Sequence, residues 1–93
     1  MRLNPKEIEV IEQSVAEVDP AAIVYLFGSR VNDAARGGDI DLLVESSCID
    51  SRKKRDLHDH LFHRLGAQKV DLFVTEDYSE PFARIARSKG VRL

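Results

Sequence analysis

The stretch Leu26-Phe27-Gly28-Ser29-Arg30, followed after a short loop by Asp39-Ile40-Asp41-Leu42-Leu43-Val44, decides how the rest of this chain is interpreted. Residues 22–27 are apolar at every position, which predicts a strand that is covered on both faces. A short helix is predicted to begin at Gly28-Ser29, and a second strand begins with two aspartates. Because residues i and i+2 of a strand face the same side, Asp39 and Asp41 project together. Two carboxylates this close repel each other unless a proton or a cation lies between them.

A third acid, Asp71, lies in the middle of a strand predicted over residues 69–74. The alternation of this strand places Asp71 and Phe73 on one face and its valine and leucine residues on the other. If both acid-bearing strands turn their aliphatic faces to one core, Asp71 lies on the side that carries Asp39 and Asp41. The pattern therefore predicts three carboxylates at one metal site, although an aspartate on a solvent-exposed strand face remains the plainer interpretation of Asp71 alone.

The end of the first part of this stretch, Gly28-Ser29-Arg30, favours a phosphate ligand. A helix that begins at Gly28-Ser29 offers free backbone N–H groups, and such groups suit a phosphate. A hard cation beside a phosphate site is the equipment for phosphoryl or nucleotidyl transfer assisted by Mg²⁺. Arg30 flanks the same site, and its alternative interpretation is an ordinary solvated charge.

Together, these residues resemble the nucleotidyltransferase family that includes DNA polymerase beta. Within it, the short length, Gly28-Ser29-Arg30 and the Asp39–Val44 segment are most similar to the minimal nucleotidyltransferases, the MNT antitoxins of HEPN ribonuclease toxins. The resemblance covers residues 20–75. It implies binding of Mg²⁺ or Mn²⁺ and catalysis by three acids: Asp39, Asp41 and Asp71. It also implies that ATP is the substrate and that three residues bind this nucleotide: Gly28, Ser29 and Arg30.

The activity that this resemblance implies is transfer of AMP from ATP to a tyrosine hydroxyl of the HEPN toxin, which silences the ribonuclease. Two alternatives stay open. The loop between Ser29 and Asp39 is one residue shorter than is usual in the minimal members, which favours a binding-only antitoxin that masks its toxin by contact. A small-molecule nucleotidyltransferase of the aminoglycoside-modifying kind is the other alternative, and it lacks support because no second domain supplies an acceptor pocket.

The order of predicted elements indicates an α/β fold with a small mixed sheet, in one domain over residues 1–93. Helices are predicted from Asn4-Pro5 to about residue 17, over residues 51–65, and from Ser79-Glu80-Pro81 to Gly90. The expected inward residues of the second helix are Leu57, Leu61, Phe62 and Leu65. Those of the third helix are Phe82, Ile85 and Ala86, and residues 91–93 are expected to form a final short strand. The nucleotidyltransferase fold that the resemblance implies has the same organisation.

Composition narrows the class of partner and compartment. A net charge of −2 does not favour a nucleic-acid partner, whose binders carry a basic surplus. The single Cys48 cannot form an internal disulfide, so a reducing cytoplasm is the expected compartment. No apolar run approaches membrane-spanning length, and the first residues do not resemble a signal peptide. We therefore expect a cytoplasmic protein that contacts neither membrane nor nucleic acid.

The second predicted helix carries two features that the proposed chemistry does not use. Its first turns hold the basic run Arg52-Lys53-Lys54-Arg55, which opposes the helix dipole. A solvated face is the favoured interpretation of this run, and contact with an acidic partner or a phosphate is the alternative. Three histidines follow, but only His60 and His63 share a face, and no cysteine or second helix completes a set of ligands. The spacing therefore argues against zinc on this helix.

Overall fold

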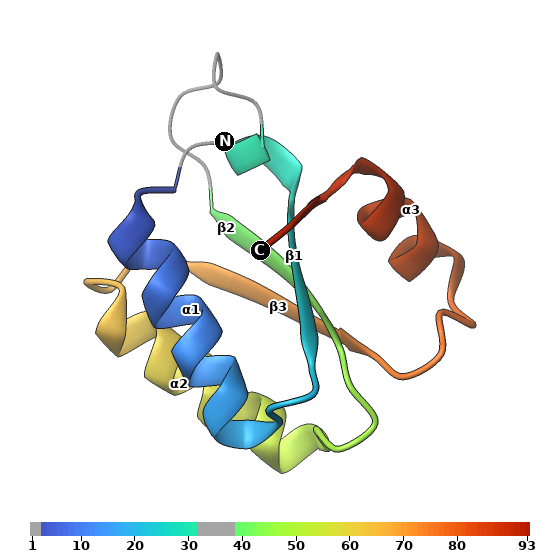
Figure 1. Ribbon diagram of the computed structural model, residues 1–93, viewed down its shortest axis with the longest axis horizontal. Helices are drawn as coiled ribbons and strands as arrows, with labels where there is room; N and C mark the ends of the chain where they lie inside the picture. The colour runs from blue at the N-terminus through green and yellow to red at the C-terminus, as the bar shows by residue number, and fades with distance from the viewer. Residues whose placement is uncertain (1–2, 32–38) are drawn as a thin grey trace.

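The structure, a computed structural model, describes residues 3–31 and 39–93, apart from the side chain of Ser29. In these parts, helices and one mixed sheet with the strand order β3-β2-β1-β4 form an α/β fold, as predicted. Figure 1 shows α1 and α2 side by side, with α3 apart from them. The elements in chain order are α1 (Pro5–Val18), β1 (Ile23–Phe27), the short 3-10 helix η1 (Gly28–Val31), β2 (Ile40–Glu45), α2 (Ser51–Arg64), β3 (Val70–Thr75), α3 (Pro81–Lys89) and β4 (Val91–Arg92).

The strand register brings the acids of the sequence motif to one end of the sheet. β1 and β2 are antiparallel with Phe27 opposite Asp41, and β2 and β3 are parallel with Asp41 opposite Asp71. β4 is antiparallel to β1 and forms the other edge. β2 begins at Ile40, so Asp39 lies one residue before the strand and not inside it as predicted. Gly37-Gly38, whose sequence permits a sharp reversal into β2, lie outside the described residues.

The main core lies between the sheet and the layer formed by α1 and α2. The aliphatic faces of β2 and β3 both turn toward this layer, as the alternation predicted. Its fully buried side chains come from both helices and all three longer strands: Ile11, Leu26, Ile40, Leu42, Val44, Leu57, Leu61 and Val70. Because each such aliphatic side chain contributes about 1.5–3 kcal/mol on burial, this face holds the sheet in place and leaves the opposite face for the acids.

The ends of the first two helices follow the sequence signals. Asn4 accepts a hydrogen bond from the backbone N–H of Glu7 at 2.8 Å, and the Glu7 carboxylate accepts one from the Asn4 N–H at 3.0 Å. This reciprocal pair is a capping box. Asp50 caps α2 by accepting from the Lys53 N–H at 2.9 Å. Gly66 follows α2 with a φ of +72°, the left-handed conformation that ends many helices.

The third helix packs differently from the prediction. Ala83 and Ala86 are its buried residues, whereas the side chains expected to face inward, Phe82 and Ile85, are 47% and 54% exposed. Two alanines let the helix approach Leu43 on the second face of the sheet. Gly90 then passes so near β1 that a Cβ on it would lie 2.9 Å from the Leu26 carbonyl oxygen. This close passage into β4 sets the rotation of α3, and large side chains do not fit beneath it.

Phe62 was also wrongly predicted to face the core. It is 36% exposed, whereas Leu57 and Leu61 are fully buried. Leu57, Leu61 and Leu65 follow one another at the i, i+4 spacing that forms a single helix face. Phe62 is one residue beyond that face, at the border with solvent. No helix in the described ranges 3–31 and 39–93 has both the length and the apolar character needed to cross a membrane.

Candidate active site

Two carboxylates meet where β2 and β3 begin. Asp41 and Asp71 are register partners in the parallel pair, and both project from the sheet face opposite α1 and α2. Neighbouring strands lie about 4.8 Å apart, so partners on one face are within side-chain contact. The structure therefore brings Asp41 and Asp71 together as the alternation of the strands predicted.

Asp39 lies at the rim of this pair. Its carboxylate is 41% exposed, and the Nζ of Lys69 lies 3.5 Å from its Oδ2. Lys69 precedes β3 and was not recognised as a site residue in the sequence, although it stands two residues before Asp71. Because both partners are exposed, this ion pair contributes little stability. The pair places the Lys69 ammonium group beside the acids, where its charge offsets part of theirs.

Gly28 is the residue against which Asp41 is packed. Its φ of +77° is in the left-handed region, and a Cβ placed on it would overlap the Oδ2 of Asp41. Glycine alone both adopts this conformation readily and leaves space for the carboxylate. The glycine of the Gly28-Ser29-Arg30 motif is thus required by the position of the Asp41 carboxylate, in addition to any role toward a ligand.

The surroundings of Asp41 disfavour its charged form. Burial, a side-chain hydrogen bond with Asp71 and the charges of Asp71 and Asp39 raise the pKa of Asp41 to about 6, while the Lys69 cation acts in the opposite direction. Two carboxyl groups share a hydrogen bond only when one of them carries a proton. A cation that replaced this proton would relieve the same repulsion.

The acids suit a hard cation by their chemistry, since Mg²⁺ binds carboxylate oxygens. Asp41 and Asp71 are in contact, and Asp39 is near enough to influence the pKa of Asp41. Within residues 3–31 and 39–93, however, no three carboxylate, imidazole or thiol groups are gathered closely enough to hold a metal ion. A site formed by all three aspartates therefore remains a prediction.

The other predicted nucleotide-binding residues lie on η1, which follows β1 directly. The Arg30 guanidinium donates a hydrogen bond to the Gln68 side-chain oxygen at 2.7 Å, and the Gln68 amide donates to the Glu7 carboxylate at 2.7 Å. These contacts tie η1 to α1 and to the loop before β3. The Ser29 side chain and the shortened loop after Val31 lie outside the described part, so the roles of Ser29 and Arg30 toward a nucleotide remain predictions.

Three phenylalanines border the acids on the same sheet face. Phe27 and Phe73 have ring centroids 5.7 Å apart, and Phe82 of α3 lies 5.8 Å from Phe27 and 5.0 Å from Phe73. The alternation of β3 predicts Phe73 on the face of Asp71 but indicates no role for it. Phe27 could have been recognised from its position in the sequence, because it immediately precedes Gly28.

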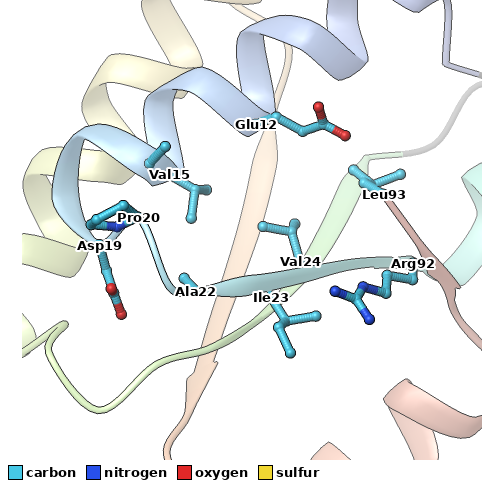
Figure 2. A pocket seen from close by; sticks show the side chains of 10 residues that line it. Glu12, Val15, Asp19, Pro20, Ala22, Ile23, Val24, Arg92 and Leu93 are labelled. Atoms are coloured by element: carbon cyan, nitrogen blue, oxygen red, sulfur yellow. The ribbon is translucent and has the colours of Figure 1, made fainter.

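A separate hollow of about 290 Å³ lies between α1 and the β1–β4 pair. Figure 2 shows its lining, with Val15 of α1 and Val24 of β1 pointing toward each other and Asp19 at one side. None of the predicted site residues lines it. On α2, the His58 Nε2 lies 2.8 Å from the carbonyl oxygen of Val70.

Comparison with known proteins gave one informative result. The model of a protein family described as the nucleotidyltransferase domain matches residues 8–93. This match begins inside α1, extends past β4 and includes Gly28, Asp39, Asp41 and Asp71. A comparison with curated proteins gave no significant match.

Proposed function

This chain belongs to the nucleotidyltransferase domain family, and we propose that it transfers AMP from ATP to a tyrosine hydroxyl of a HEPN ribonuclease toxin, as the cytoplasmic antitoxin of that toxin. Nucleotidyl transfer in general follows from the family. The observation that carries the proposal is the position of Asp41, packed against Gly28 and hydrogen-bonded to Asp71 at one end of the sheet. The HEPN partner is supported by the sequence resemblance over residues 20–75.

The residues of the chain divide the work of the proposed reaction. Asp39, Asp41 and Asp71 would hold Mg²⁺ or Mn²⁺, which when bound offsets the charge on the reacting phosphate. The acceptor hydroxyl oxygen forms a bond to the α-phosphorus of ATP, and the bond from that phosphorus to the bridging oxygen of pyrophosphate breaks. A carboxylate oxygen of Asp71 takes the proton of the hydroxyl, and pyrophosphate leaves. Tyrosine AMP is the product.

Gly28 and its neighbours would bind the leaving part of the nucleotide. The absence of a side chain at Gly28 allows a phosphate, like the Asp41 carboxylate, to approach the backbone closely. Ser29 would add a hydroxyl donor and Arg30 a positive charge. The contact from Arg30 to Gln68 anchors this turn, so that its backbone N–H groups keep one orientation.

A binding-only antitoxin is the second candidate. It is favoured by the loop between Ser29 and Asp39, which is one residue shorter than is usual in the minimal nucleotidyltransferases. Such a protein would keep the fold and mask its toxin without chemistry. It would not need Mg²⁺ or ATP.

Co-expression with a HEPN ribonuclease toxin, the proposed acceptor, followed by intact-mass analysis of that toxin, tests the proposal. We expect the unmodified chain to add the mass of one AMP, and Asp41→Asn and Asp71→Asn to add none while the complex still forms. Asp56→Asn is the matched control, because Asp56 is an exposed acid of α2. A toxin that is inhibited without any gain of nucleotide mass would establish masking and reject the transferase proposal.

A further inference from the structure

An exposed apolar surface lies directly beside the candidate active site. It consists of Phe73 on β3 and Phe82 and Ile85 on α3, which are 38%, 47% and 54% exposed, and we call these three residues the apolar platform. The rings of Phe73 and Phe82 are in contact, and Phe82 and Ile85 are neighbours on the helix surface at i, i+3. Exposed apolar side chains that cluster in this way, rather than singly, are typical of interaction surfaces.

The same helix is strongly basic although the chain as a whole is slightly acidic. Residues 81–93 contain Arg84, Arg87, Lys89 and Arg92 and no aspartate or glutamate, against a net charge of −2 for the chain. Local charge of one sign beside an apolar surface selects partners of the opposite charge and speeds their encounter. The occupant of this surface is therefore expected to be acidic.

Two of these cations are held in fixed positions without a carboxylate partner. Arg84 donates hydrogen bonds to the carbonyl oxygens of Tyr78 and Ser79 at 2.7 and 3.3 Å. The Arg87 guanidinium lies 4.8 Å from the centre of the Tyr78 ring. Among residues 3–31 and 39–93, no acid lies within ion-pair distance of either guanidinium. Both arginines line a hollow of about 480 Å³ with Tyr25, Tyr78 and Ser88, which leaves room for a side chain of a partner.

We propose that the apolar platform and the arginines of α3 form the docking surface for the acceptor protein, which presents a segment with apolar side chains flanked by acids. This inference rests on the proposed function and extends it by assigning the surface and the chemistry of the partner. Phe82 and Ile85 supply the apolar contacts, and Arg84 and Arg87 bind the flanking carboxylates. An acidic protein segment fits this surface better than a nucleic acid, whose phosphates would also meet the acids of the site.

The place of the platform explains how docking presents the acceptor hydroxyl. Phe73 is two residues from Asp71 on the same face of β3, a separation of about 7 Å. Phe82 also touches Phe27, the register partner of Asp41. A segment seated on the platform therefore reaches the carboxylate pair with a neighbouring side chain. The acceptor hydroxyl is selected by this contact with α3 and not by a closed pocket.

Affinity measurements with a purified HEPN ribonuclease toxin, the proposed acceptor, test the docking surface. We expect Ile85→Glu and Arg87→Glu each to weaken the complex by about tenfold or more, and added salt to weaken the unmodified complex. Phe62→Glu is the matched control, because Phe62 is an exposed phenylalanine on α2, in the other layer, and its complex should be unchanged. Thermal melts and Mg²⁺-ATP binding should be unaffected in all three variants.

The outcomes separate the docking inference from the proposed function. A complex that Ile85→Glu and Arg87→Glu leave as tight as the unmodified one, or the failure of any complex to form, overturns the inference, and Mg²⁺-ATP binding still tests the nucleotidyltransferase. If the chain alone self-associates and Ile85→Glu makes it monomeric, the platform is an interface between copies and the inference is also overturned. If both variants break a complex in which no AMP is transferred, docking stands and the transfer proposal falls.

Discussion

Asp19 and Asp41 lie at opposite ends of the same sheet, and their surroundings shift their pKa values in opposite directions. The Asp19 carboxylate accepts hydrogen bonds from the Ser46 hydroxyl at 2.5 Å and from the Ala21 N–H at 2.9 Å, and these contacts lower the pKa of Asp19. Burial and the neighbouring Asp71 and Asp39 raise the pKa of Asp41 to about 6. Hydrogen-bond donors of the chain favour the charged form of Asp19, whereas burial and neighbouring carboxylates disfavour the charged form of Asp41.

The difference indicates which end of the sheet is functional. Asp19 closes the turn between α1 and β1, and with Ser46 it joins that turn to the end of β2. Every contact there is made within the chain, as is usual for a structural acid. The charged form of Asp41 is disfavoured, and a proton or a cation from outside would relieve this cost. An acid perturbed by burial and by like charges is the kind that marks functional sites.

The largest expected effect is the loss of transfer activity in Gly28→Ala, which changes the surroundings of Asp41. The new Cβ would displace the Asp41 carboxylate, and a displacement of about 1 Å at a reacting centre lowers activity by roughly 10²-fold. The measurement is the rate of the proposed AMP transfer to a HEPN toxin. Gly66→Ala is the matched control, because Gly66 also has a positive φ of +72° but nothing lies within 4 Å of its added Cβ. Equal loss of transfer in both variants would assign the effect to backbone strain.

The second largest expected effect is the dependence of ATP binding on a divalent cation. ATP should bind weakly without divalent ions and at least about tenfold more tightly with Mg²⁺ or Mn²⁺, because the clustered acids repel a triphosphate. Calorimetric titration with and without EDTA measures this gain. Asp41→Asn should lose most of the gain, and Asp19→Asn should keep it. An affinity that does not depend on the metal in the unmodified chain would contradict a cation site.

Stability should respond in opposite senses at the two ends. Ser46→Ala removes the hydroxyl that donates to Asp19 and accepts from the Cys48 N–H, and we expect it to lower the free energy of unfolding by about 1–2 kcal/mol. Asp41→Asn should leave stability unchanged or slightly higher in metal-free buffer, because it relieves the repulsion from Asp71. Thermal melts in EDTA compare the two variants. A marked loss in Asp41→Asn would make this acid structural too.

The smallest expected effect is the pH dependence of stability. The folded-state pKa of Asp41, about 6, is above its ordinary value of 3.8, so the folded chain binds this proton more tightly than the unfolded chain. The destabilising contribution of Asp41 is present above pH 6 and disappears as the pH falls toward 4. Asp71, Asp39 and Lys69 are the charged groups that act on it.

The melting temperature of the unmodified chain, relative to that of Asp41→Asn, should therefore rise as the pH is lowered from 7 to 5 in metal-free buffer. Subtracting the variant removes the opposite contributions of acids whose pKa is lowered, such as Asp19. A relative melting temperature that falls over this interval would contradict the raised pKa of Asp41.

Local signals predicted most of the framework of this protein. The capping box of Asn4 and Glu7 and the cap at Asp50 depend on atoms three residues apart, so they can be read without the fold. The pairing of Asp41 with Asp71 followed from the period of two in each strand, once the aliphatic faces were assigned to one core. The fold class and the face that carries these acids were therefore predictable.

The structure alone showed the contacts between distant segments. The hydrogen bond from Ser46 to Asp19 joins residues 27 positions apart, and the one from Arg30 to Gln68 joins residues 38 positions apart. No pattern in the neighbouring sequence indicates either contact. The ion pair of Lys69 with Asp39 is likewise a consequence of the parallel pairing of β2 and β3.

The sequence by itself determined the elements and the shared face of Asp41 and Asp71, because strand alternation is a property of adjacent residues. The need for glycine at position 28 appeared only with the tertiary packing of the Asp41 carboxylate against it. The rotation of α3 was decided only by tertiary packing. Ala83 and Ala86 allow close approach to Leu43, and Gly90 passes against β1, so Phe82 and Ile85 are turned outward beside the acids. A helix with apolar residues on several sides buries whichever face fits the available space, and that space exists only once the sheet has formed.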